Sequence, residues 1–150
     1  MKVVLINPDI PWNAGNIGRT CVATNSELIF VGKLGFDINS KEIRRSGLDY
    51  WQHLKYSVFK TFEEFLETLG ENPSLIFFST KGKKTLWDAP YQKDSCLIFG
   101  GETSGFPLEY HKKYPNKIFR IPMSSSKIRS LNLSSSAAIV LYQAIRATAQ

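Results

Sequence analysis

Short runs of consecutive apolar residues recur along this chain, and they restrict its fold more than any other feature. They occupy residues 3–6, 28–31, 75–79 and 96–100, with less continuous candidates at 56–59 and 117–121. An apolar residue at every position, instead of at alternate positions, is typical of a strand buried on both faces of a parallel sheet. Such strands require a covering layer on each side of the sheet.

Segments with helical spacing alternate with these strands. We expect helices over residues 14–25, 62–69, 108–113 and 133–148, with Thr61 as the N-cap of the second and serines capping the start of the last. The alternation predicts an α/β fold, with a mainly parallel sheet and helices on both of its faces. A chain of 150 residues can form one such domain, spanning residues 1–150.

Composition narrows the class of protein. The net charge of +6 favours a polyanionic partner such as RNA. The longest apolar runs are too short to span a bilayer, and no signal peptide precedes the first strand. We therefore expect a cytoplasmic protein without a membrane partner.

The few cysteines and histidines give no sign of a metal site. Cys21 and Cys96 lack neighbours at metal-ligand spacing and are interpreted as reduced core residues. His53 and His111 are interpreted as ordinary surface or packing residues. Neither a Ser-His-Asp triad nor a histidine-based metal site is supported.

Familiar nucleotide and nucleophile motifs are absent. The first strand runs into NPDIP at residues 7–11, so the glycine-rich dinucleotide fingerprint is missing. The GKKT at 82–85 lacks the leading glycine of a phosphate loop, and the serine of GETSG at 101–105 is one place too late for a nucleophile elbow.

Three polar loops follow predicted strands, at residues 13–19, 99–105 and 124–132. Open α/β sheets bind their ligands at the carboxyl ends of the strands. The serines, amides and backbone groups of these loops suit a small polar ligand and not a metal. The loops therefore predict one composite site.

The same segments resemble the SPOUT superfamily of RNA methyltransferases. The resemblance is carried by NAGNIGRT at 13–20, RRSGLDY at 44–50, FG and ETSG within 99–105, RIPM at 120–123 and RSLNLS at 129–134. It covers essentially the whole chain and is closest to the small tRNA (cytidine/uridine) 2′-O-methyltransferases that modify the wobble nucleotide.

The resemblance implies an enzyme that uses S-adenosyl-L-methionine, releases S-adenosyl-L-homocysteine and needs no metal. It also implies a deep trefoil knot in the C-terminal segment and a homodimer with each cofactor site near the subunit interface. Since larger relatives have an extra RNA-binding domain that this chain lacks, the catalytic domain itself is expected to hold the tRNA.

The resemblance also assigns residues to the cofactor site. Gly100 is expected to allow close backbone approach, and Glu102 to bind a ribose hydroxyl or a backbone amide of a neighbouring loop. The expected contacts, several of them through an apolar adenine pocket, are Phe78, Gly100, Glu102, Ile121, Met123, Ser130, Leu131 and Leu133.

Three residues are candidates for catalysis. Arg19 matches the arginine of the first motif and is expected to bind the phosphate beside the target ribose or to stabilise the developing alkoxide, since a guanidinium is a poor proton acceptor. Asn132 is expected to orient the hydroxyl or to shape the cofactor loop. Tyr142 matches a tyrosine near the active site, and core packing is its alternative role.

Basic and aromatic residues are candidates for RNA contact. Arg44 and Arg45 offer a phosphate grip, and Lys81 and Arg129 lie near the cofactor loops. Trp51, Trp87 and Tyr91 either stack on an exposed base or pack within the protein.

The predicted function is therefore 2′-O-methylation of the wobble ribose (C34 or U34) of tRNA. Open alternatives are a 2′-O-methyltransferase for another tRNA or rRNA nucleotide, a non-catalytic RNA-binding module of the same fold, and a flavodoxin-like enzyme for a small nucleotide.

Overall fold

The strands form one parallel sheet. The computed structural model describes residues 1–149, apart from the side chains of residues 46–48. The sheet order is β3-β2-β1-β6-β4-β7-β5, and every pairing between these strands is parallel. The strands are β1 (Lys2–Ile6), β2 (Glu27–Val31), β3 (Tyr56–Phe59), β4 (Leu75–Phe78), β5 (Lys84–Thr85), β6 (Cys96–Gly100) and β7 (Ile118–Arg120).

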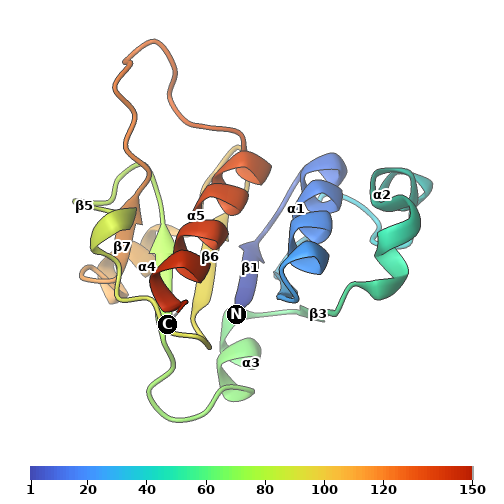
Figure 1. Cartoon of the computed structure of the whole chain (residues 1–150), viewed down its shortest axis with the longest axis horizontal. Coiled ribbons are helices and arrows are strands. Elements are labelled where there is room, and N and C mark those ends of the chain that lie inside the picture. Colours follow the sequence, from blue (N-terminus) through green and yellow to red (C-terminus); the bar gives the residue numbers. More distant parts are fainter. Residues whose placement is uncertain (150) are drawn as a thin grey trace.

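Helices cover both faces of the sheet, as predicted (Figure 1). On one face α1 and α5 lie side by side, with α2 beyond α1. On the other face α3 and α4 contribute Phe62, Phe65 and Tyr110 to a separate apolar cluster. The helices are α1 (Pro11–Ala23), α2 (Lys41–Gly47), α3 (Phe62–Glu67), α4 (Leu108–Lys113) and α5 (Leu133–Thr148), with 3-10 turns η1 (Leu48–His53) and η2 (Leu86–Asp88).

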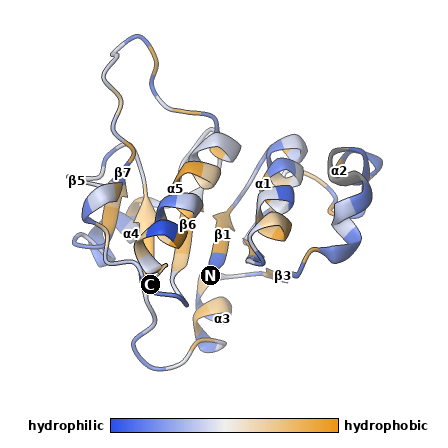
Figure 2. Cartoon of the chain, viewed as in Figure 1, coloured by the Kyte–Doolittle hydropathy of each residue, from blue (hydrophilic) through white to orange (hydrophobic). Residues whose placement is uncertain are grey.

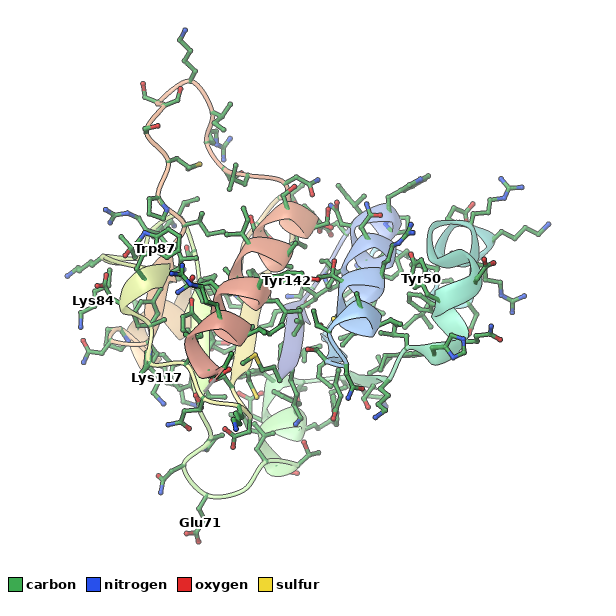
Figure 3. All side chains as sticks on the ribbon, in the orientation of Figure 1. Tyr50, Glu71, Lys84, Trp87, Lys117 and Tyr142 are labelled. Carbon is green, nitrogen blue, oxygen red and sulfur yellow. The ribbon has the colours of Figure 1, made fainter. Side chains whose placement is uncertain are left out.

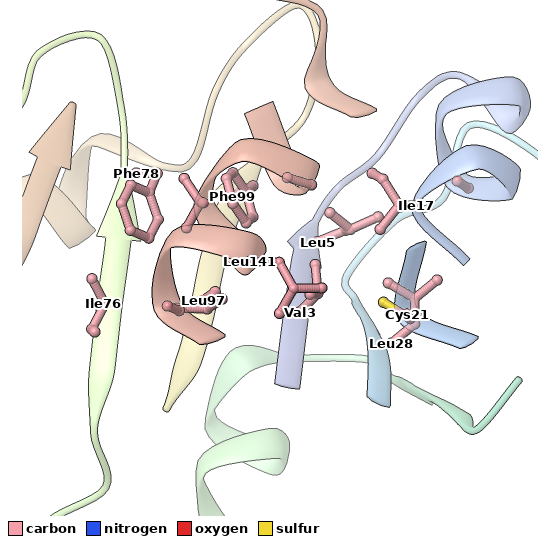
Figure 4. Close-up of a cluster of buried hydrophobic side chains, with 14 of the residues drawn as sticks. Val3, Leu5, Ile17, Cys21, Leu28, Ile76, Phe78, Leu97, Phe99 and Leu141 are labelled. Atoms are coloured by element: carbon pink, nitrogen blue, oxygen red, sulfur yellow. The ribbon is translucent and has the colours of Figure 1, made fainter. Parts of the chain in front are cut away.

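Consecutive residues of each central strand enter opposite cores. In β1, Val3 and Leu5 pack under α1 and α5, whereas Val4 and Ile6 pack on the other face. The close-up in Figure 4 shows the first of these cores, and Figure 2 shows that the inner strands are apolar while polar residues lie on the outer helices. This two-sided burial explains why the strands are apolar at every position and confirms the α/β prediction.

The predicted elements were located well, but their ends and caps differ in places. The helix predicted from residue 14 begins at Pro11, whose fixed φ and missing N–H suit a first helical position. Thr61 caps α3, as predicted, because its Oγ1 accepts from the Glu64 N–H at 3.2 Å. The prediction that serines cap α5 was wrong: the side chain of Asn132 is the N-cap. The short elements α2, η1, β5 and η2 were not predicted.

Strand β7 lies between β4 and β5, so the segment that joins β4 to β5 crosses the end of β7. Gly82 permits this crossing, because a Cβ there would lie 2.5 Å from the Phe119 carbonyl carbon. The Arg120 guanidinium donates to the carbonyls of Gly82 and Lys83, both at 3.0 Å. The segment that leaves β7 starts beside this crossing segment, as it would in a knotted chain. The knot itself stays a prediction.

Both cysteines lie in the core with free thiols, as predicted. Burial raises the pKa of Cys21 to about 12 and that of Cys96 to about 11, so both remain thiols at neutral pH. Among the residues described, no helix has the length and apolar character needed to cross a membrane.

Candidate functional site

A cavity of about 760 Å³ lies at the carboxyl edge of the sheet, where the loops after β1, β4, β6 and β7 meet. All of the residues predicted to contact the cofactor line it: Phe78, Gly100, Glu102, Ile121, Met123, Ser130, Leu131 and Leu133. Asn132, Lys81 and Arg129 line it as well. The structure therefore brings together segments that are more than half the chain apart.

The lining of the cavity combines apolar and polar residues. Phe78 and Phe99 stack with ring centroids 5.3 Å apart and are largely buried, and Ile121 and Leu133 pack against the same core. The polar lining residues include Glu102, Thr103, Ser104 and Lys81. A ligand with one flat apolar part and one polar part matches this combination.

Glu102 holds the loop after β6 against the start of α1. Its carboxylate accepts from the Asp9 N–H at 2.7 Å, from the Ile10 N–H at 3.1 Å and from Asn13 Nδ2 at 3.1 Å. A carboxylate at a helix N-terminus is also favoured by the helix dipole. Of the two partners predicted for Glu102, the structure shows the backbone amides of a neighbouring loop.

Asn13 extends this contact to the loop before α5. Its side chain is 5% exposed, and its Oδ1 accepts from Asn132 Nδ2 at 3.0 Å. Asn132 Oδ1 in turn accepts from the N–H groups of Ser134 and Ser135 at 2.9 and 3.3 Å. Asn132 thus shapes the loop and begins α5, which is one of its two predicted roles; orientation of a substrate hydroxyl stays a prediction.

Two glycines at the end of β6 and just after it allow the polar loop to fold back tightly. A Cβ on Gly100 would lie 2.0 Å from the Phe106 nitrogen, and one on Gly101 would lie 2.3 Å from the Asn7 carbonyl oxygen. The close approach at Gly100 is thus made by the chain's own backbone, and the predicted approach of a ligand stays a prediction. Any larger residue at either position would push the loop out of the cavity wall.

Arg19 and Tyr142 are not among the described residues that line the cavity. Arg19 is exposed on α1, where its guanidinium lies 5.4 Å from the ring centroid of Tyr50. The Tyr50 hydroxyl donates to the Gly15 carbonyl at 2.9 Å; burial raises the pKa of Tyr50, and the charge of Arg19 partly offsets this. Tyr142 is 55% exposed on α5 (Figure 3). The structure keeps both residues on the outer face of α1 and α5.

The candidate RNA contacts are spread over the molecule. Arg44 and Arg45 are exposed on α2, apart from the cavity. Trp51 packs inward, since a Cβ on Gly18 would lie 3.1 Å from its ring. Tyr91 donates to the Leu86 carbonyl at 2.8 Å, whereas Trp87 is 61% exposed (Figure 3). Of the three aromatic candidates, Trp87 alone presents most of its ring to solvent.

Two features of the cavity escaped the sequence interpretation. In the sequence, Asn13 is only the first residue of the NAGNIGRT segment. No sequence pattern indicates that its buried side chain links Glu102 to Asn132. His111 packs, as interpreted, with its ring stacked on Phe106 at 4.6 Å, but it also lines the cavity. Within the part of the chain that the structure describes, no group of three or more His, Cys, Asp or Glu residues comes together to hold a metal.

Comparison with known proteins supports one reading of this geometry. Residues 1–142 match the model of the SpoU rRNA Methylase family. A protein of Synechocystis sp. assigned as a tRNA (cytidine(34)-2′-O)-methyltransferase is 44% identical over 147 residues, which is 97% of this chain and 95% of that protein. A structure solved to explain the 2-OH methylation of C/U34 on tRNA has a TM-score of 0.91 and 36% identity, covering 97% of this chain and 93% of the other. An AdoMet-bound rRNA methyltransferase from Sinorhizobium meliloti has a TM-score of 0.85 and 25% identity, covering 97% of this chain and 56% of the other.

Replacing Glu102 by Gln tests the contact between the loops. The amide keeps one acceptor oxygen but places a donor NH₂ among the N–H donors of Asp9 and Ile10. We expect the free energy of unfolding, measured by urea titration, to fall by about 1–3 kcal/mol. The matched control is Glu109→Gln on the exposed side of α4, which should change stability by less than about 0.5 kcal/mol. Equal stability of the two variants would show that Glu102 does not hold the loops together.

Proposed function

Because this chain belongs to the SpoU rRNA methylase family, we propose that it transfers a methyl group from S-adenosyl-L-methionine to the 2′-hydroxyl of the wobble nucleotide, C34 or U34, of tRNA. The observation that carries the proposal is the composite cavity, which gathers every predicted cofactor contact at one edge of the sheet. With tRNA as its substrate, the enzyme is expected in the cytoplasm, and one methyltransferase domain accounts for the whole chain.

The cavity suits the cofactor. Phe78, Ile121 and Leu133 form an apolar wall for an adenine ring, and the glycine-rich loop after β6 offers backbone groups for hydrogen bonds. A volume of about 760 Å³ lies within the range of about 300–1,000 Å³ that is usual for small-molecule sites. Bound there, S-adenosyl-L-methionine would supply an electrophilic methyl group. The residues of the chain then have to orient the ribose hydroxyl and stabilise its negative charge.

Arg19 is the candidate for this electrostatic role. Its guanidinium stays charged and is held beside Tyr50, which itself is fixed to α1. A fixed cation stabilises a developing alkoxide or binds the phosphate beside it. Arg44, Arg45, Lys81 and Arg129 are further cations for the tRNA backbone, and the net charge of +6 attracts a polyanion.

A homodimer through α1 and α5 would place Arg19 at the interface between the two copies. The exposed stripe of α1 contains Trp12, Asn16 and Arg19, and that of α5 contains Ile139 and Tyr142. Trp12 is 59% exposed and Ile139 41% exposed, and the two helices lie side by side (Figure 1). An exposed apolar face of this kind marks a contact between proteins. Pairing this face with a second copy buries these residues and places Arg19 and Tyr142 at the interface.

The function is tested by methyl transfer. Labelled S-adenosyl-L-methionine is incubated with tRNA that lacks this modification, and the labelled nucleotide is mapped by mass spectrometry. We expect a 2′-O-methyl group on nucleotide 34. Label on another nucleotide, or on rRNA, would replace the proposed substrate and keep the chemistry. Cofactor binding without transfer to any RNA would favour a non-catalytic RNA-binding module.

An Arg19→Ala variant separates chemistry from cofactor binding. Since Arg19 does not line the cavity, S-adenosyl-L-homocysteine should bind nearly as tightly as to the wild type in calorimetry. Loss of a fixed cation should lower the single-turnover rate by about 100-fold or more. The control is Lys117→Ala, an exposed cation just before β7 and at the opposite end of that strand from the loop after β7 (Figure 3). Unchanged transfer by the Arg19 variant would remove this residue from the reaction.

The dimer is tested by Ile139→Glu. A charge at this exposed position of α5 adds a desolvation cost to any contact that buries the face. We expect the wild type to sediment as two chains and the variant as one in analytical ultracentrifugation. The matched control is Ile128→Glu, which is 53% exposed on the loop before α5 and lies outside the stripe. A wild-type protein that sediments as a single chain would exclude the proposed homodimer.

A further inference from the structure

Two basic residues line the cavity near each other. Lys81 belongs to the loop after β4, and His111 belongs to α4. The charge of Lys81 is close enough to act on the imidazole of His111. The sequence interpretation gave His111 only a surface or packing role.

The ring of His111 is held in a fixed place. It stacks on Phe106 with a centroid distance of 4.6 Å and an angle of 29° between the rings. Phe106 is itself buried, and it also lines the cavity. A histidine held against a buried ring loses little side-chain entropy when a ligand binds.

The free protein disfavours a charge on His111. Burial and, second, the charge of Lys81 lower its pKa. An anion bound beside both residues would oppose the effect of Lys81 and favour the protonated imidazole. The other charged residues lining the cavity are Glu102 and Arg129, and Glu109 and Lys112 are exposed on its own helix. The Glu102 carboxylate accepts from the N–H groups of Asp9 and Ile10, so it is directed toward α1.

We propose that Lys81 and His111 form an oxyanion-binding end of the cavity, with His111 taking up a proton as the anion binds. The inference rests on the proposed function, which supplies two oxyanions: the α-carboxylate of the cofactor and a phosphate of the RNA. The α-carboxylate is the only oxyanion of the cofactor.

Proton uptake fixes the direction of the pH effect. The bound anion raises the pKa of His111 above its value in the free protein. Affinity for the anion is therefore highest at low pH and falls as pH rises between the free and bound pKa values. A ligand without the oxyanion shows no such dependence on His111.

The test compares two ligands that share the adenosine part. S-adenosyl-L-homocysteine carries the carboxylate, and 5′-methylthioadenosine does not. Dissociation constants are measured by calorimetry from about pH 5 to about pH 7, around the ordinary histidine pKa of about 6.5. Variants are His111→Gln and Lys81→Met, with His53→Gln and Lys117→Met as exposed controls.

We expect His111→Gln to remove the pH dependence of S-adenosyl-L-homocysteine binding and Lys81→Met to weaken it at least about tenfold, since hydrogen bonds to charged groups are worth about 1.5–3 kcal/mol. Binding of 5′-methylthioadenosine by the variants should be unchanged, which also shows that they are folded. If the RNA phosphate is the anion, the variants bind both adenosine ligands as the wild type does. The pH-dependent loss of affinity then appears in tRNA binding instead.

Two other outcomes are distinguishable. Variants that bind both ligands and tRNA like the wild type, at every pH, would overturn the oxyanion site and leave the proposed function intact. A wild-type protein that binds neither adenosine ligand would overturn the cofactor assignment itself.

Discussion

The hydrogen-bonded chain Glu102–Asn13–Asn132 is the interaction on which the cavity depends. It joins the start of α1 to two loops that lie 89 and 119 residues farther along the chain, through one carboxylate and two amides. Asn13 is almost fully buried, so loss of either partner leaves a polar group that neither water nor protein satisfies, at a cost of about 1–3 kcal/mol. Because Asn132 also begins α5 and Glu102 holds the start of α1, the same few atoms fix the cavity and both helices of the outer face.

The parallel sheet brings these loops within reach of one another. Ile6, at the end of β1, lies opposite Val31 on one side and Gly100 on the other, so neighbouring strands end at the same level. Their loops must then leave the same edge, and Gly100 and Gly101 let the loop after β6 turn back sharply between its neighbours. The continuous apolar strands thus have two consequences. Their burial on both faces favours a parallel sheet, and the parallel sheet places the polar loops at one edge.

The parts of the fold that depend on local patterns were predictable, and the parts that depend on distant contacts were not. Burial on both faces could be predicted for the central strands β1, β2, β4 and β6, whereas the predicted edge strand β3 is largely exposed. The cap at Thr61 could be predicted from its place before a helix. The short strand β5 gave no such signal, because it is held by β7 and by the bonds of Arg120 to Gly82 and Lys83. The lining of the cavity was anticipated through resemblance and not through periodicity. His111 was missed because one histidine on a six-residue helix has no spacing that points to a cavity.

The distribution of residues separates two tasks in the proposed reaction. The predicted contacts for the cofactor all line a cavity of one chain, so the proposed cofactor site lies within a single copy. Arg19 lies six residues after Asn13 on α1, which is about 9 Å along the helix axis, and it faces outward beside Trp12. One rigid helix therefore has its first turn fixed at the cavity of its own chain and its exposed arginine directed to a second surface. In the proposed homodimer, any shift of the loop after β6 would move α1 and with it the arginine offered to the partner, because Glu102 joins the two directly.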